Sequence, residues 1–178
     1  AYAEQDSKAT PPPLPPQRVS LDDARQELTE LIGLQGIKTE IDSLVNFLAL
    51  QKSRADVGLP ATQLSLHSVF TGNPGTGKTT VARIVGKIFC AMDILSKGQV
   101  IETDRSGLVA EFAGQTGPKT NKKIDEAIDG ILFIDEAYTL ISDGNEDPYG
   151  HEAVQTLLKR MEDDRDRLVV VLAGYPQP

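Results

Sequence analysis

Residues 72–79 read Gly72-Asn73-Pro74-Gly75-Thr76-Gly77-Lys78-Thr79 and fit the pattern G-x-x-x-x-G-K-[ST]. A short apolar run that ends at Thr71 precedes them and predicts a buried strand, and an amphipathic pattern predicts a helix from Thr79 to about Leu95. A glycine-rich loop between a strand and a helix turns its backbone N–H groups toward phosphate oxygens, and the helix adds its positive N-terminus. The segment therefore predicts a phosphate-binding loop rather than a glycine-rich turn without a ligand.

The residue types in this loop predict separate roles. Lys78 would reach the β and γ phosphates, and the hydroxyl of Thr79 would bind Mg²⁺. The predicted nucleotide contacts are Gly72, Asn73, Pro74, Gly75, Thr76, Gly77, Lys78, Thr79 and Thr80.

A second apolar strand is predicted at residues 131–134, and it is followed by Asp135 and Glu136. A strand that ends in two acids is a weak signal alone, but downstream of a phosphate-binding loop it predicts the second half of a nucleotide site. Asp135 would hold Mg²⁺ through water, and Glu136 would orient and polarise the water that attacks the γ-phosphate. We therefore predict Lys78 and Glu136 as catalytic residues and expect a hydrolase.

A guanine-specific site is the alternative, and the sequence disfavours it. Residues 121–125 read Asn-Lys-Lys-Ile-Asp, which resembles the N-K-x-D motif but carries one residue too many. They also precede the Asp135-Glu136 strand, where the motif would follow it. We expect ATP or ADP as the ligand.

The remaining pattern alternates helices and strands, which predicts an α/β fold with a parallel sheet covered on both sides. Ser20 is a predicted N-cap of a short helix through Leu31. The other predicted elements are helices over residues 37–48, 119–128 and 151–161, the last with Val154, Leu157 and Leu158 inward, and strands over residues 99–102 and 168–172.

The composition is that of a globular protein of one domain, with 178 residues, 39% of them apolar and 25% charged. The net charge is −8, and the acidic excess lies between Asp125 and Asp166. Nucleic acid is thus an unfavoured partner, because nucleic-acid affinity rests on clustered Lys and Arg. Lys119, Lys122 and Lys123 form the only short basic cluster, which we interpret as a solvated helix face.

Other residues in the sequence argue against disulfide bonds, membrane spans and a zinc site. Cys90 is the single cysteine, so it forms no disulfide within the chain, and we expect it to be buried in its helix. No apolar run approaches the ~20 residues of a membrane span, and the first residues lack the order of a secretion signal, so we expect a cytoplasmic protein without a membrane partner. His67 and His151 have no companion ligands, which argues against zinc; His151 is predicted to be solvated.

We expect residues 1–19 to be a flexible proline-rich leader and residues 20–178 to form the nucleotide-binding domain. Five prolines between positions 11 and 16 favour an extended chain over packed structure. Residues 12–15 fit the loose P-x-x-P form of an SH3 ligand, an alternative that any proline-rich linker would satisfy.

The chain as a whole resembles the AAA+ ATPases, and more narrowly the CbxX/CfqX group, which includes the red-type rubisco activase and the stage V sporulation protein K-like ATPases. The resemblance extends from Leu28 to Pro176. It rests on residues 31–34, 72–79, 134–138, 152–153, 157–158, 161–163 and 171–175 and on the segment around Phe112.

The resemblance implies further site residues. Ile32 and Gly33 would pack against the adenine, and Tyr175 would be the polar sensor at the end of a strand. Phe112, Ala113 and Gly114 would form the pore loop with which hexameric members grip a polypeptide, and the three lysines would line the same channel.

The resemblance also implies a strand order of 5-1-4-3-2 and a ring-forming motor, a hexamer that remodels a protein client, with rubisco as one possible client. The chain ends before the family's fifth strand, arginine finger and helical lid, so we expect a piece of a longer protein with weak hydrolysis of its own. The alternative hypothesis is a nucleotide-dependent binding module that hydrolyses little. A DNA loader, which rests on the three lysines alone, conflicts with the acidic balance.

Overall fold

The structure is a computed structural model, and it describes residues 19–60, 64–141 and 147–175. Residues 1–18 of the predicted leader, with the P-x-x-P segment, lie outside the described residues. The helices are α1 (Leu21–Glu30), α2 (Gln35–Asp56), α3 (Lys78–Ala91), α4 (Arg105–Leu108), α5 (Thr116–Ala127) and α6 (Pro148–Asp163), with a 3-10 helix η1 (Ala137–Leu140). The strands are β1 (Ser68–Thr71), β2 (Val100–Thr103), β3 (Gly130–Ile134) and β4 (Leu168–Gly174).

The described strands form one parallel sheet in the order β1-β4-β3-β2. Leu172 of β4 lies between Val69 of β1 and Ile134 of β3. The segments that follow these three strands therefore leave the sheet side by side at its carboxyl edge, where open α/β sheets bind their ligands. This order agrees with the 1-4-3-2 part of the predicted arrangement.

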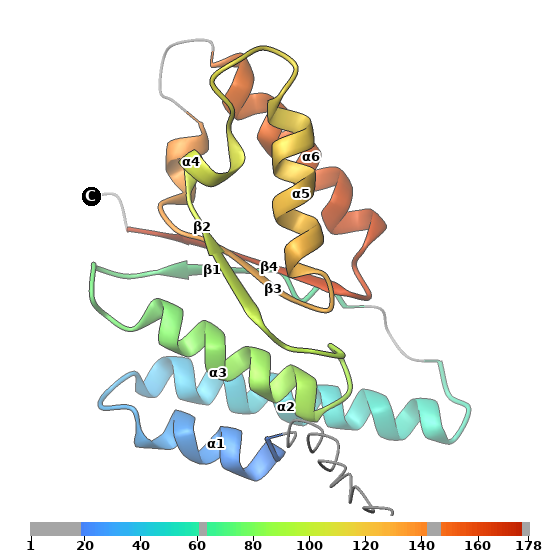
Figure 1. Cartoon of the computed structure of the whole chain (residues 1–178). Coiled ribbons are helices and arrows are strands. Elements are labelled where there is room, and N and C mark those ends of the chain that lie inside the picture. Colours follow the sequence, from blue (N-terminus) through green and yellow to red (C-terminus); the bar gives the residue numbers. More distant parts are fainter. Residues whose placement is uncertain (1–18, 61–63, 142–146, 176–178) are drawn as a thin grey trace, which may run out of the picture.

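Helices cover both faces of the sheet, with α1, α2 and α3 on one face and α4, α5 and α6 on the other (Figure 1). Strand β3 contributes to both cores, because Ile131 and Phe133 pack with the first set of helices while Leu132 and Ile134 pack with the second. All residues of β3 are buried, as predicted. The three-layer α/β/α architecture and the mostly parallel sheet are thus confirmed.

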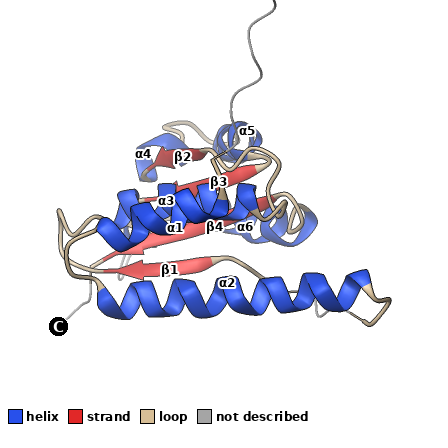
Figure 2. Ribbon diagram, turned by 90° about the horizontal axis from the view of Figure 1, so that it is seen from below, coloured by secondary structure: helices blue, strands red, loops and turns tan. Residues whose placement is uncertain are grey.

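Several predictions of burial are wrong. Leu64, in the apolar run predicted to be a buried strand, is 39% exposed. Val69 is 69% exposed, because β1 lies at the edge of the described sheet beside α2 (Figure 2). Leu158 is 61% exposed, because it lies about 100° around α6 from Leu157, which faces the core. Cys90 is half-buried, with its Sγ 3.8 Å from the carbonyl oxygen of Ser96.

The ends of several helices also differ from prediction. Ser20 caps α1 by accepting a hydrogen bond from the N–H of Asp23, as expected. Helix α3 ends at Ala91 instead of Leu95, and the chain turns at Asp93, whose φ is +60. Helix α5 begins at Thr116, three residues before the predicted start. Helices α4 and η1 were not predicted, because each is too short to show a hydrophobic period.

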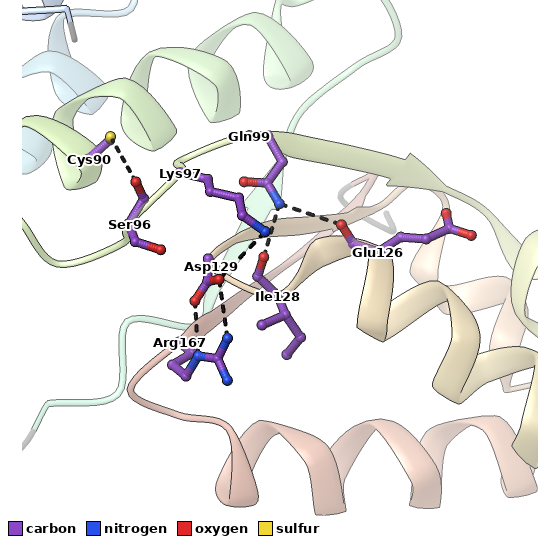
Figure 3. Close-up of polar contacts among 8 residues, drawn as sticks. All are labelled: Cys90, Ser96, Lys97, Gln99, Glu126, Ile128, Asp129 and Arg167. Atoms are coloured by element: carbon purple, nitrogen blue, oxygen red, sulfur yellow. Dashed lines mark hydrogen bonds and ion pairs between the residues drawn. The ribbon is translucent and has the colours of Figure 1, made fainter. Parts of the chain in front are cut away.

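The amino ends of β2, β3 and β4 meet in a cluster of Lys97, Gly98, Asp129 and Arg167, here called the Asp129 cluster (Figure 3). The N–H of Asp129 donates to the carbonyl of Arg167, and its own carbonyl accepts from the N–H groups of Lys97 and Gly98. Its carboxylate accepts two hydrogen bonds from the Arg167 guanidinium, at 2.9 and 3.1 Å. The cluster therefore joins three strand ends through backbone and side chain together.

Candidate functional site

The predicted phosphate-binding loop joins β1 to α3, since β1 ends at Thr71 and α3 begins at Lys78. Gly75 and Gly77 have φ angles of +74° and +85°, a conformation that other residues rarely adopt. Gly77 is the N-cap of α3, so the first N–H groups of the helix face the loop without acceptors inside the helix. The structure thus provides the strand–loop–helix setting that the motif requires.

Side chains within the loop bind its own backbone. The Lys78 ammonium donates to the carbonyl oxygens of Gly72 at 2.8 Å and Asn73 at 3.1 Å. The Thr76 hydroxyl donates to the same Asn73 oxygen at 2.8 Å. Lys78 is therefore held at the loop by neutral acceptors. Of the other predicted contacts, Asn73, Pro74 and Thr80 are exposed and Thr79 is half-buried.

Asp135 and Glu136 follow β3 at the same edge of the sheet. The N–H of Asp135 donates to the carbonyl of Thr103, and its carboxylate accepts the N–H of Glu136 at 3.0 Å. Glu136 has φ +48° and ψ +43°, which is the left-handed region. The backbone therefore turns sharply at the residue predicted to orient water.

Tyr175 follows β4 and lies between the phosphate-binding loop and the acidic pair. Its hydroxyl donates to the Glu136 carboxylate at 3.0 Å, and its ring centroid lies 5.1 Å from the Lys78 ammonium. The ring also contacts Tyr138, with centroids 5.9 Å apart. The hydrogen bond to Glu136 raises the pKa of Tyr175 above its ordinary value, because it stabilises the protonated phenol. Tyr175 thus brings Lys78 and Glu136 into one site.

The site offers oxygen donors of the kind that Mg²⁺ prefers. Thr79 lies in the first turn of α3, and the exposed carboxylate of Asp135 lies beyond β3 at the same edge of the sheet. Mg²⁺ usually keeps several waters and binds through one or two protein groups plus phosphate oxygens. Among the described residues, no group of three or more His, Cys, Asp or Glu side chains is arranged to hold a metal ion. Two protein ligands with phosphates fit Mg²⁺ better than an all-protein cage.

A cavity of about 440 Å³ lies beside the loop, between α2 and the sheet, and Gly72, Thr76 and Lys78 form part of its wall. Leu34 and Ile37 also line it, whereas Ile32, predicted to pack against adenine, is 98% exposed and does not. Gly33 is exposed, with φ +72°. Sequence reasoning assigned Ile37 only to the core face of a helix, and it placed Leu34 in the family segment 31–34 without a contact of its own.

The predicted pore loop is an exposed segment, residues 111–115, here called the 111–115 loop. Phe112 is 65% exposed, Ala113 and Gly114 are exposed beside it, and Gly114 has φ +77°. The Thr116 hydroxyl accepts the N–H of Ala110 at 3.1 Å and so closes the base of the loop. An exposed phenylalanine on an anchored base suits contact with another molecule.

Lys119 and Lys123 of the basic cluster and the N-K-x-D-like segment on α5 have structural partners, and Lys122 is exposed. Lys119 donates to the carbonyls of Ser106 and Val109, and Lys123 pairs with Glu126. Asn121 and Asp125 both accept from the Arg160 guanidinium of α6, at 3.0 and 2.8 Å. These contacts fasten α5 to its neighbours and agree with the rejection of a guanine site.

The two histidines differ. His151 is exposed on α6, as predicted. His67 accepts the N–H of Val170 at Nδ1, 3.0 Å away, and its Nε2 lies 3.1 Å from the carbonyl oxygen of Met161. Since Nδ1 accepts, Nε2 carries the proton and donates. His67 therefore links β4 to the end of α6.

Comparison with known proteins adds a family and named relatives. The family model "ATPase family associated with various cellular activities (AAA)" matches residues 68–177. The ESX-3 secretion system protein EccA3 of Mycobacterium leprae is 46% identical over 157 residues, covering 88% of this chain and 24% of the relative. The ESX-1 secretion system protein EccA1 is 49% identical in M. leprae and 48% in M. tuberculosis H37Rv, covering 87% of this chain and 27% of each relative.

The chain thus spans about a quarter of the length of the curated relatives it matches. None of the helices in residues 19–60, 64–141 and 147–175 combines the length and the apolar character needed to cross a membrane.

Proposed function

The chain belongs to the AAA family of ATPases, and from that premise we propose that residues 20–178 form one domain that hydrolyses Mg²⁺-bound ATP to remodel a protein partner. The observation that carries the proposal is the position of Tyr175, which contacts both the lysine of the phosphate-binding loop and the carboxylate of Glu136. The triphosphate of an ATP molecule bound to the phosphate-binding loop would then end beside Glu136.

The chain's own residues account for the steps of this reaction. The Lys78 ammonium would leave the carbonyls of Gly72 and Asn73 for the β and γ phosphate oxygens, a stronger, charge-assisted contact. Mg²⁺, bound through Thr79 and Asp135, would neutralise phosphate charge. Glu136 would accept a hydrogen bond from the attacking water and orient it. Tyr175, which already donates to Glu136, would sense the γ-phosphate by the position of that carboxylate.

We propose a protein of an ESX-type secretion system as the partner, because the relatives reported above are named for those systems. The 111–115 loop would grip it through Phe112, in a hexameric ring of the full-length protein. The narrower CbxX/CfqX assignment and rubisco as the client draw no support from these relatives, so secretion is the better-supported setting.

The test compares the protein with its Glu136→Gln variant, which keeps the side-chain shape and removes the base. We expect ATP affinity to stay within about threefold and turnover to fall ~100-fold, the loss typical of removing a positioned acid–base group. A variant that hydrolyses ATP as fast as the parent would contradict the role of Glu136.

A second candidate function is a nucleotide-dependent switch with little turnover. The Tyr175–Glu136 hydrogen bond favours it, because the carboxylate that would orient water is already engaged. The same assay separates the two candidates. Tight ATP binding with equally negligible turnover in the parent and in Glu136→Gln, in the full-length protein as well as in this chain, would favour the switch over the motor.

A further inference from the structure

The turn that begins at Glu136 is a strained element that needs support. The carbonyl of Glu136 accepts both the N–H and the hydroxyl of Thr139, at 2.8 and 2.7 Å. A left-handed conformation costs a residue other than glycine ~1–2 kcal/mol, and it persists only where the surroundings hold it. The groups that hold this turn therefore decide where the Glu136 carboxylate lies.

Arg105, from a separate part of the chain, holds the far end of this turn. One guanidinium nitrogen donates to the carbonyl oxygen of Thr139 at 2.9 Å, and the other lies 2.6 Å from a carboxylate oxygen of Asp147. The second carboxylate oxygen of Asp147 accepts the N–H of Gly150 at 3.1 Å and caps α6. Arg105 thereby joins η1 to the start of α6.

The packing at this junction leaves no spare room. A side chain at Gly150 would overlap the carbonyl oxygen of Leu140 and would lie 3.0 Å from the Arg105 guanidinium. Arg105 itself is only about one-third exposed at its side chain. The guanidinium, η1 and the first turn of α6 therefore pack closely against one another.

Arg105 is also the first residue of α4, and the α4 segment supports the 111–115 loop. Lys119 of α5 donates to the carbonyls of Ser106 at 2.7 Å and Val109 at 2.9 Å, and the Thr120 hydroxyl donates to the carbonyl of Leu108. Side chains of α5 thus hold the backbone of residues 106–109, which connects Arg105 to the base of the 111–115 loop.

A cavity of about 450 Å³ separates the loop from the acidic site. Its wall includes Glu111 of the loop, Glu136 and Thr139 of the turn, and Arg105. Glu111 at the start of the loop and Glu136 of the turn therefore line the same space, and the Arg105 side chain reaches from the α4 segment to the turn.

We infer that Arg105 is a positioning residue, which holds the Glu136 turn in its hydrolytic geometry and transmits the position of the 111–115 loop to it. The inference rests on the proposed function and adds a link between the gripping loop and ATP turnover. The planar guanidinium suits this task, because its fixed fork contacts two groups at once, whereas a lysine ammonium is a single point charge.

The experiment compares Arg105→Ala and Arg105→Lys with Arg165→Ala, which removes a more exposed arginine paired with Glu162. We expect Arg105→Ala to lower kcat for ATP ~10-fold per folded molecule with KM within about twofold, because displaced catalytic groups lower the rate more than substrate binding. Arg105→Lys keeps the charge but loses the fork, so it should recover kcat only in part, to a value between those of Arg105→Ala and the parent. Arg165→Ala should leave both constants unchanged.

A second measurement tests whether Arg105 connects the nucleotide site to the 111–115 loop. We expect ATP to change hydrogen exchange of the amides of residues 111–115 in a Glu136→Gln background, and we expect this response to disappear when Arg105→Ala is added.

Two results would overturn the inference. One is an unchanged kcat per folded molecule in Arg105→Ala, with any loss explained by a lower melting temperature alone. The other is an exchange response of the loop that survives the substitution. A parent protein that neither binds nor hydrolyses ATP would instead contradict the proposed function.

Discussion

The two ends of the parallel sheet contain similar charged residues but give them different partners. At the amino end, the Arg167 guanidinium and the Asp129 carboxylate bind each other through two hydrogen bonds. At the carboxyl end, the Lys78 ammonium faces two carbonyl oxygens and the ring of Tyr175, and Glu136 accepts a phenol. Among the described residues, no ion pair joins Lys78 to Glu136.

The charges at the amino end stabilise the fold by pairing with each other, whereas those at the carboxyl end have neutral partners that a ligand could replace. An arginine paired with a carboxylate in a fork geometry can change partner only by leaving an opposite charge behind. A lysine on carbonyl oxygens leaves neutral groups that water can satisfy. We therefore expect substitutions at the carboxyl end to remove activity and those at the amino end to remove stability.

The largest expected effect is that of Lys78→Ala at the carboxyl end. It should weaken ATP binding ~100-fold, because two charge-assisted contacts to phosphate are worth ~3 kcal/mol together. The melting temperature without nucleotide should stay within about 2 °C, since the carbonyls left behind become accessible to water. Calorimetric titration and thermal unfolding check both parts, and a large fall in melting temperature would break the comparison.

Gly98→Ala at the amino end should destabilise the fold by ~3 kcal/mol and leave ATP affinity per folded molecule unchanged. Gly98 has φ +68°, and a side chain there would overlap the carbonyl oxygen of Gly86 in α3. Gly58→Ala is the matched control, because Gly58 has φ +76° with no atom within 4 Å of the added carbon. It should cost only ~1 kcal/mol in chemical denaturation, and equal losses would show that crowding at Gly98 is unimportant.

The sequence predicted the fold well where the signal is local. The glycine pattern of residues 72–79 and the apolar run of β3 each carry their structure within a few residues. The order of the strands was predicted from the family resemblance, and its 1-4-3-2 part agrees with the sheet. The exposure of Val69 was mispredicted because a short apolar run does not reveal that alternate residues of β1 are exposed.

Contacts between distant segments could not be predicted in the same way. His67 was considered a residue without companions, yet it binds backbone groups of Met161 and Val170, and backbone partners leave no trace in residue types. Arg105 shows the same limit, since its partner at Thr139 is a carbonyl oxygen. The prediction that Tyr175 is a sensor came from family resemblance alone, and its contact with Glu136 could not be predicted without the strand order.

His67→Ala extends the comparison to the start of β1, which also lies at the amino end. It should lower the free energy of unfolding by ~1–2 kcal/mol, because a buried Val170 N–H and a Met161 carbonyl lose their partners. His151→Ala, at an exposed histidine of α6, should change stability by less than ~0.5 kcal/mol. ATP affinity should be unchanged in both variants, and a loss confined to ATP binding would place His67 with the carboxyl end instead.

The smallest expected effect is that of Asp129→Asn, and it should depend on pH. The Arg167 guanidinium, through its hydrogen bonds, lowers the pKa of Asp129 below its ordinary value of 3.8. As the pH falls through that value, the unfolded chain takes up this proton before the folded one, so the stabilisation present at neutral pH is lost. The parent should therefore lose melting temperature more steeply between about pH 5 and pH 3 than Asp129→Asn does.

Asp56→Asn, at an exposed acid at the end of α2, serves as the control and should keep the steep fall of the parent. If Asp129→Asn keeps it as well, the Asp129–Arg167 pair contributes nothing measurable, and the amino end is held by its backbone bonds and glycine packing alone. If the fall is shallower only in Asp129→Asn, the paired charge itself stabilises the sheet. The same substitution should leave ATP affinity at neutral pH unchanged, because the Asp129 cluster lies at the amino ends of the strands whereas Lys78 follows the carboxyl end of β1.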